Sequence, residues 1–163
     1  MNPELRIFVY GTLKKGFSNH DTYCTGVSRI EPARLRGRLY KYTPEIPIMV
    51  LPESDILAVG TGNTADDMRT QQGVSAGAFP ADAPPNNWKT VSGEILFFDD
   101  PDTRLPFIDS LEEFHPDGPS TYLRVLVRAE LADGSLTTAW AYVAGFDISK
   151  LESYDGQDWF PEN

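Results

Sequence analysis

Residues 5–16 of the chain read LRIFVYGTLKKG, and this stretch decides the fold. Its first five side chains alternate and favour β structure, which predicts a strand over Leu5 to Val9. Gly11 ends the strand at a tight corner, where glycine allows backbone torsions that other residues resist. Consecutive amide groups at such a corner can converge on an anion. Gly11, Thr12 and Leu13 are therefore candidates to bind a substrate carboxylate or an oxyanion, although a simple turn is the alternative interpretation.

The rest of the chain consists of short elements separated by turns, since Gly and Pro each occur 13 times. We expect further strands over residues 35–49, 91–98, 122–131 and 136–143. A short helix is predicted over residues 19–27 and a longer one over residues 103–114, with Pro106 in its first turn. Hairpins outnumber alternating strands and helices, which favours an α+β fold with a curved sheet or a small barrel.

Residues 52–90 are rich in Gly, Ala, Asp, Pro and Asn, and we predict a long surface excursion that is partly ordered at best. Within it, residues 60–65 read GTGNTA, which is similar to a dinucleotide-binding fingerprint. Residues 66–72 contain one apolar side chain and so have no apolar face to pack on a sheet. No strand–helix–strand unit follows, and a dinucleotide site is therefore rejected.

Length and charge limit the classes of function. The 163 residues, of which 40% are apolar, fit one domain over residues 1–163. The net charge of −10 disfavours binding to nucleic acid or to an anionic membrane, because both need clustered Lys and Arg. No apolar run approaches the roughly 18 residues of a membrane helix. The opening residues, MNPELR, lack the features of a signal peptide, so we expect a cytoplasmic protein.

Cysteine and histidine are scarce. Cys24 is the single cysteine, which excludes an intramolecular disulfide and a cysteine-based zinc site. The histidines are His20 and His115, so a His-rich metal site is improbable and we expect no metal and no cofactor. We predict that Cys24 is a small buried residue and that His20 lies in a surface loop. The acidic run at residues 99–102 is interpreted as a solvated turn and helix cap.

The predicted helix over residues 103–114 carries two adjacent glutamates that are not equivalent. At about 100° per residue, its apolar side chains form one arc: Leu105, Phe107, Ile108, Leu111 and Phe114. Glu112 lies between Ile108 and Leu105 in this projection, whereas Glu113 faces away. A carboxylate partly removed from water has a raised pKa, which a general acid or base near neutral pH requires. The alternative is that Glu112 sits at the rim and reaches water.

Six short motifs follow one another along the chain. They are VYGTLKKG at residues 9–16 with Asn19 and His20 after it, GRLY at 37–40, VSGEI at 91–95, IDSLE at 108–112, YLR at 122–124 and AWAYV at 139–143. In this order they resemble the γ-glutamylcyclotransferase-like (AIG2-like) family. The resemblance covers residues 5–143 apart from 52–90, and it implies the family fold, a small mixed β-barrel flanked by helices.

The resemblance also implies a reaction. In that family the α-amine of a γ-glutamyl amine or peptide attacks its own γ-amide carbonyl, which gives 5-oxoproline and a free amine. This is an intramolecular aminoacyl transfer. The catalytic acid/base is the glutamate that closes the L-D-x-x-E motif, which is Glu112 here. The corner at residues 11–13 would hold the carboxylate or oxyanion. Tyr10, Tyr122 and Tyr142 are candidates to line the pocket, with barrel core as the alternative.

The sequence departs from the family pattern at two places. Glu113 stands where the family usually has glycine, and residues 52–90 are longer than in compact members. Two other functions stay open: an amide hydrolase or acyl transferase that uses the same pocket, and a non-catalytic small-molecule-binding or interaction module on the same fold. The leaving amine and the oligomeric state cannot be read from the sequence.

Overall fold

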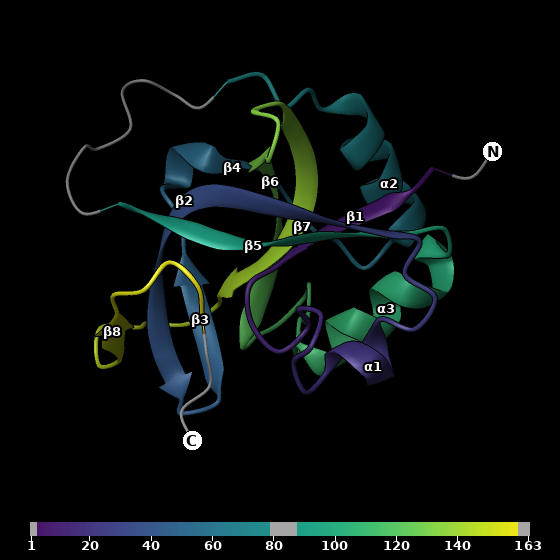
Figure 1. Cartoon of the computed structure of the whole chain (residues 1–163). Helices are drawn as coiled ribbons and strands as arrows, with labels where there is room; N and C mark the ends of the chain where they lie inside the picture. The colour runs from purple at the N-terminus through teal and green to yellow at the C-terminus, as the bar shows by residue number, and fades with distance from the viewer. Residues whose placement is uncertain (1–2, 79–87, 160–163) are drawn as a thin grey trace.

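The computed structural model describes residues 3–78 and 88–159, and five of its strands close into a barrel (Figure 1). In order of pairing, the ring consists of β2 (Arg29–Thr43), β5 (Lys89–Phe98), β1 (Leu5–Val9), β7 (Leu136–Ala144) and β6 (Tyr122–Leu131), which pairs back with β2. The β1–β7 pair is parallel and the other pairs of the ring are antiparallel. The predicted α+β fold with a small mixed β-barrel is therefore confirmed.

Three further strands extend the ring. Strands β3 (Ile46–Val50) and β8 (Glu152–Tyr154) pair with β2, and β4 (Ile56–Val59) pairs with β6. The helices are α1 (His20–Tyr23), α2 (Thr64–Gly73) and α3 (Pro101–Leu111), and a 3-10 helix spans Glu53–Asp55. Figure 1 shows the three α-helices on one side of the barrel, while β3 and β8 lie on the other side.

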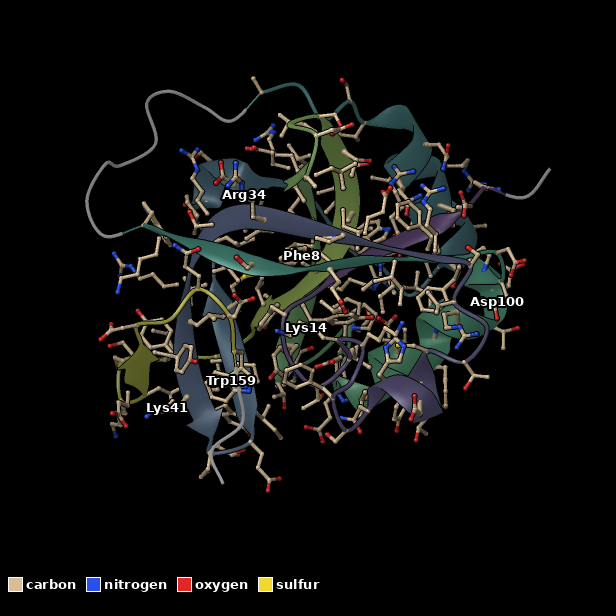
Figure 2. The ribbon with its side chains drawn as sticks, viewed as in Figure 1. Phe8, Lys14, Arg34, Lys41, Asp100 and Trp159 are labelled. Carbon is tan, nitrogen blue, oxygen red and sulfur yellow. The ribbon has the colours of Figure 1, made fainter. Side chains whose placement is uncertain are left out.

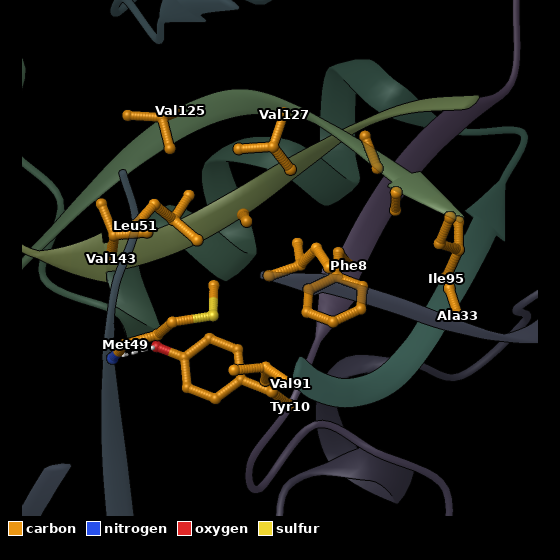
Figure 3. Packing of buried hydrophobic residues seen from close by; sticks show 14 of the residues in the cluster. Phe8, Tyr10, Ala33, Met49, Leu51, Val91, Ile95, Val125, Val127 and Val143 are labelled. Carbon is orange, nitrogen blue, oxygen red and sulfur yellow. Dashed lines mark hydrogen bonds between the residues drawn. The ribbon is translucent and has the colours of Figure 1, made fainter. Parts of the chain in front are cut away.

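Strand β1 is buried on both faces and separates two apolar clusters. Phe8 and Tyr10 point into the barrel, where they pack with residues such as Met49 (Figure 3). Ile7 and Val9 point the other way, into the cluster between the barrel and the helices. A strand in this position has no solvent face, which explains why it reads as a nearly continuous apolar run. The end of β1 is consequently held in a fixed place.

Both predicted helices differ from the structure in their extent. The predicted helix over residues 19–27 is confined to α1, because the chain turns after Cys24 and enters β2 at Arg29. Helix α3 begins at Pro101 and ends at Leu111 rather than spanning 103–114. Pro106 therefore lies inside the helix and not in its first turn. Phe107, expected on the apolar arc, is 44% exposed and stacks on Tyr23.

Residues 52–90 are not a surface excursion, and this prediction is wrong for the part of it that the structure describes. The segment contributes β4, which pairs antiparallel with β6, and then α2. The GTGNTA stretch lies between them and leads into α2, whose first turn is capped by the Asn63 side chain accepting from the Asp66 amide. Residues 79–87, which include the PPNN stretch, lie outside the described residues.

Helix α2 packs on the barrel although it lacks an apolar face, because it buries polar side chains that have partners. Asp67 accepts hydrogen bonds from Thr61 and from Arg124 on β6. The Gln71 side chain accepts from the Arg6 amide at 3.0 Å and donates to the Glu4 carbonyl at 2.7 Å, alongside β1. Hydrophobic periodicity does not detect such a helix, because Met68 is the single apolar residue among its three buried positions and the other two are Asp67 and Gln71.

These contacts predict that Asp67 stabilises the whole protein. Asp67→Ala removes one of the carboxylates from a buried guanidinium, and breaking a buried ion pair costs about 3 kcal/mol or more. Asp66→Ala is the matched control, because that neighbouring carboxylate is exposed and its ion pair with Arg69 is worth less than about 1 kcal/mol. Urea unfolding of both variants measures the difference. Equal and small losses would show that α2 contributes little to the fold.

Candidate active site

A pocket at the end of β1 brings together all the site residues that the sequence predicted. Its cavity volume is small, about 40 Å³. The lining residues are Phe8, Val9, Tyr10, Gly11, Thr12, Leu13, Ile46, Pro47, Glu112, Tyr122 and Tyr142. The individual roles of these residues stay predictions.

Gly11 is required at the corner for a different reason from the one that the sequence suggested. Its φ is not positive, unlike that of Gly16, so the corner needs no left-handed glycine. Instead, a Cβ atom at Gly11 would lie 2.8 Å from Cγ of Pro47, which also lines the pocket. The close approach of β1 to β3 therefore excludes any side chain at this position.

The residues after the corner are fixed by side chains that follow them. The Asn19 amide group donates to Thr12 Oγ1 at 2.8 Å, and Nδ1 of His20 lies 2.8 Å from the Leu13 carbonyl oxygen. His20 is only 8% exposed, so its prediction as a surface histidine is wrong. Lys14 Nζ donates to the Trp159 carbonyl at 3.4 Å, and this contact joins the corner to the end of the described chain (Figure 2).

Backbone donors are available at this corner. Within residues 3–78 and 88–159, the amides of Thr12 and Leu13 donate to no protein acceptor. The carbonyl oxygens of Gly11, Thr12 and Leu13 are occupied, because they accept from Lys14, Asn19 and the His20 side chain. Thr12 and Leu13 line the pocket, so the corner offers it two N–H groups without a protein acceptor among the described residues, which suits an anion.

The three tyrosines are both barrel core and pocket wall. Each is at most 7% exposed. The Tyr10 hydroxyl donates to the Tyr142 carbonyl at 2.7 Å and accepts from the Met49 amide (Figure 3), and the Tyr122 hydroxyl donates to the Pro47 carbonyl at 2.6 Å. These bonds fix the rings, so that a tyrosine can belong to the barrel core and line the pocket at the same time.

Glu112 caps the C-terminus of α3 and lines the pocket. Its amide donates to the Ile108 carbonyl at 3.0 Å, so the residue keeps nearly helical geometry although the helix ends at Leu111. Burial and, to a smaller extent, the neighbouring Asp109 carboxylate together raise the pKa of the Glu112 carboxyl to about 8. A group with this pKa exchanges protons near neutral pH.

Behind Glu112 lies an ionic network that the sequence analysis did not assign to the site. Asp109 accepts from Arg124 Nε at 2.8 Å and from the Tyr142 hydroxyl at 2.6 Å. Arg124 is 1% exposed and also donates to Asp67. The sequence signal for this network was present in two motifs, because Asp109 precedes Glu112 by one helical turn and Arg124 follows Tyr122 by two strand positions.

Other polar groups of the described chain offer no second chemical centre. Burial raises the pKa of the Cys24 thiol to about 12, and its prediction as a buried residue is confirmed. Asp100 lies at the N-cap of α3 as predicted, but its side chain makes no capping hydrogen bond and forms an ion pair with Arg104 one turn along the helix. The described residues contain no cluster of three or more His, Cys, Asp or Glu side chains that would hold a metal ion.

The fold and the pocket define a small α+β protein with a mixed β-barrel, in which a backbone corner and a carboxyl with a raised pKa line one pocket. A family model described as "Gamma-glutamyl cyclotransferase, AIG2-like" matches residues 7–71 and 57–161. The chain belongs to this family, and membership supports a γ-glutamyl cyclotransferase-like function. No curated protein matches it in sequence.

Solved structures show the same fold. An AIG2-like protein from Mus musculus is 21% identical, with a TM-score of 0.54, and the match covers 98% of this chain and 90% of that chain. YkqA from Bacillus subtilis is 20% identical, with a TM-score of 0.53 over 96% of this chain. The chain spans 40% of the length of YkqA. Among the described helices, none is long and apolar enough to cross a membrane.

The raised pKa of Glu112 predicts a pH-dependent stability. Because the folded-state pKa of about 8 lies above the ordinary value of 4.5, the neutral carboxyl stabilises the fold at low pH, and this contribution is lost progressively as pH rises from 4.5 through 8. Glutamine does not titrate. We expect Glu112→Gln to lie within about 1 kcal/mol of wild type at pH 5 and to be more stable by up to about 5 kcal/mol at pH 9, since each pKa unit is worth about 1.4 kcal/mol.

Urea unfolding at a series of pH values measures this gap. Glu113→Gln serves as the control, because the Glu113 side chain is exposed. The difference in unfolding free energy between this variant and wild type should not change with pH. Parallel stability curves for wild type and Glu112→Gln would contradict the buried position of the Glu112 carboxyl.

Glu113 predicts a second effect on stability, because it occupies the left-handed region with φ of 52°. This position follows the cap of α3, where glycine is favoured. Glu113→Gly should raise the free energy of unfolding by up to about 1 kcal/mol, whereas Glu113→Val should lower it by about 1–2 kcal/mol. Thermal or urea unfolding of the two variants measures the difference. If Glu113→Gly were less stable than Glu113→Val, the left-handed backbone at Glu113 would not be strained.

Proposed function

We propose that this protein cyclises γ-glutamyl amines or peptides to 5-oxoproline and releases the amine, with Glu112 as the group that moves the proton. Family membership supports the reaction class. The observation that carries the proposal is the juxtaposition, in one pocket, of the Glu112 carboxyl with a raised pKa and the unpaired amides after Gly11.

The nucleophile in this reaction is part of the substrate. The α-amine nitrogen attacks the γ-amide carbonyl carbon, forming the C–N bond of the five-membered ring. The carbonyl oxygen becomes an oxyanion, and then the bond to the leaving amine breaks. When the α-amine enters as its ammonium form, one proton leaves before the attack and a second leaves as the ring nitrogen becomes an amide. The departing nitrogen takes up one of these protons to leave as an amine, and the other goes to solvent. Holding both ends of one molecule in a folded conformation supplies most of the rate enhancement that a ring closure needs.

Glu112 is suited to both proton transfers. An α-amino group has an ordinary pKa of about 8, close to the value of the Glu112 carboxyl. A proton therefore moves between them at small energetic cost, and the same carboxyl then returns it to the leaving amine. A carboxylate with its ordinary pKa would accept the proton from the ammonium group far less readily.

The corner and the tyrosines complete the site. Among the described residues that line the pocket, none is a lysine or an arginine. A substrate carboxylate or the oxyanion is therefore left to the amides of Thr12 and Leu13, since the hydroxyls of Tyr10, Tyr122 and Tyr142 already donate to protein acceptors. The tyrosine rings would shape the space around the glutamyl chain.

Two neighbouring substitutions test the proposal. Glu112→Gln should lower kcat/KM for γ-glutamyl compounds by about 10³-fold or more, because the proton carrier is lost. Glu113→Gln should lower it less than about threefold, because that side chain points away and pairs with Thr121. Incubation with a panel of γ-glutamyl amines and peptides, followed by mass spectrometry for 5-oxoproline, provides the assay.

The products distinguish the competing functions. Free glutamate in place of 5-oxoproline would indicate a hydrolase in the same pocket. An inert panel, with ligand binding unaffected by Glu112→Gln, would indicate a binding module. Equal losses in the two glutamine variants would remove Glu112 from the mechanism.

A further inference from the structure

Large apolar side chains are exposed at the mouth of the pocket. Ile46 lines the pocket and is 37% exposed, although it begins a strand whose next residues are buried. Tyr42 and Phe146 are exposed to a similar extent, and their ring centroids lie 5.5 Å apart. We call Tyr42, Ile46 and Phe146 the mouth platform. Tyr42 and Ile46 lie in the hairpin between β2 and β3, and Phe146 is distant from both in the sequence, so the contact of Phe146 with Tyr42 is a property of the tertiary structure.

The backbone holds each member of the platform in place. Tyr42 lies in an irregularity of the β2–β3 pairing between Lys41 and Thr43, and Thr43 pairs with Ile46. Such bulges re-aim side chains. Phe146 follows Gly145, whose amide donates to the Thr121 carbonyl at 3.0 Å beside the pocket residue Tyr122. The Tyr42 phenol is close enough to Tyr122 to contribute to the raised pKa of that residue, after burial and Glu112.

The charges around the platform are acidic. Glu45 lies in the hairpin between Tyr42 and Ile46, and Asp147 directly follows Phe146; both are exposed. Hydrogen bonds from Ser149 lower the pKa of Asp147, so this carboxylate stays ionised. The nearby Lys41 ammonium already pairs with Glu152. An anionic group at the platform would meet repulsion, while an uncharged apolar group would cover exposed rings.

The polar end of the pocket would bind the glutamyl half of the substrate, so the mouth remains available for the amine half. With the α-amine at Glu112 and the oxyanion at the corner, the glutamyl part occupies the inner pocket, and the leaving amine must extend toward the opening. We propose that the mouth platform is the subsite for the leaving amine and selects γ-glutamyl derivatives of uncharged aromatic or large apolar amines. This inference rests on the proposed function.

A matched pair of substrates tests the platform. γ-Glutamylphenethylamide and γ-glutamylethylamide differ by one phenyl group and carry the same net charge. We expect kcat/KM to be about tenfold higher or more for the phenethylamide, because covering a phenyl ring and two exposed aromatic rings removes apolar surface from water. Phe146→Ala and Tyr42→Ala should each reduce the ratio below about threefold. Comparing the ratio between wild type and variants cancels the intrinsic reactivity of the two amides.

Two further variants control for folding and for general effects of aromatic residues. Phe146→Leu keeps apolar area at the mouth and should keep most of the preference. Phe107→Ala removes an aromatic ring of similar exposure that does not line the pocket, so the ratio should equal that of wild type. A wild-type ratio near one, or an equal drop in Phe107→Ala, would overturn the assignment of the platform.

Binding to the Glu112→Gln variant separates this inference from the proposed function. Calorimetry should give an affinity about tenfold higher for the phenethylamide, and the added Phe146→Ala substitution should abolish the difference. If the variant prefers the phenethylamide but the wild-type protein turns over neither amide, cyclisation is refuted and the subsite is still supported. Turnover of both amides with equal affinities would support cyclisation and refute the subsite.

Discussion

Arg124 is the constraint on which the rest of the structure depends. Its guanidinium is buried, pairs with Asp109 of α3 and Asp67 of α2, and stacks between the rings of Phe114 and Trp140 at centroid distances of 5.0 and 4.9 Å. A buried cation requires these partners, so α2 and α3 must lie against β6. Burial, and then the Asp109 carboxylate that Arg124 holds in place, favour the neutral form of Glu112.

Strand β1 provides the other half of the site. Because it is buried on both faces, its end cannot shift without disturbing the barrel or the helices. The corner is then fixed by the close approach of Pro47 to Gly11 and by the hydrogen bonds of Asn19 and His20. The Glu112 carboxyl and the corner at residues 11–13 are therefore held in place by two independent parts of the core. Electrostatic stabilisation of a transition state is effective when the groups that supply it are fixed in advance.

The same side chains tie the fold together and line the pocket. The hydroxyls of Tyr10 and Tyr122 bond to neighbouring strands and that of Tyr142 bonds to Asp109 of α3, and all three residues line the cavity. Glu113 lies outside the pocket and accepts a left-handed conformation, which glycine adopts most easily. Its strain is local, and Thr121 binds its carboxylate on the exposed side.

The sequence by itself determined strands β1, β5, β6 and β7, the glycine corner and the inward position of Glu112, because apolar alternation and helical spacing encode which face is buried. The single strand predicted over residues 35–49 was wrong, because the chain turns after Thr43 and β3 pairs back antiparallel with β2. The sequence also failed for α2 and His20, because their burial depends on polar partners distant in the chain: Asp67 with Arg124, and His20 with the Leu13 carbonyl. The mouth platform also arose only in the tertiary structure. No local pattern marks Tyr42, Ile46 and Phe146 as neighbours, since a bulge and a strand end bring them together.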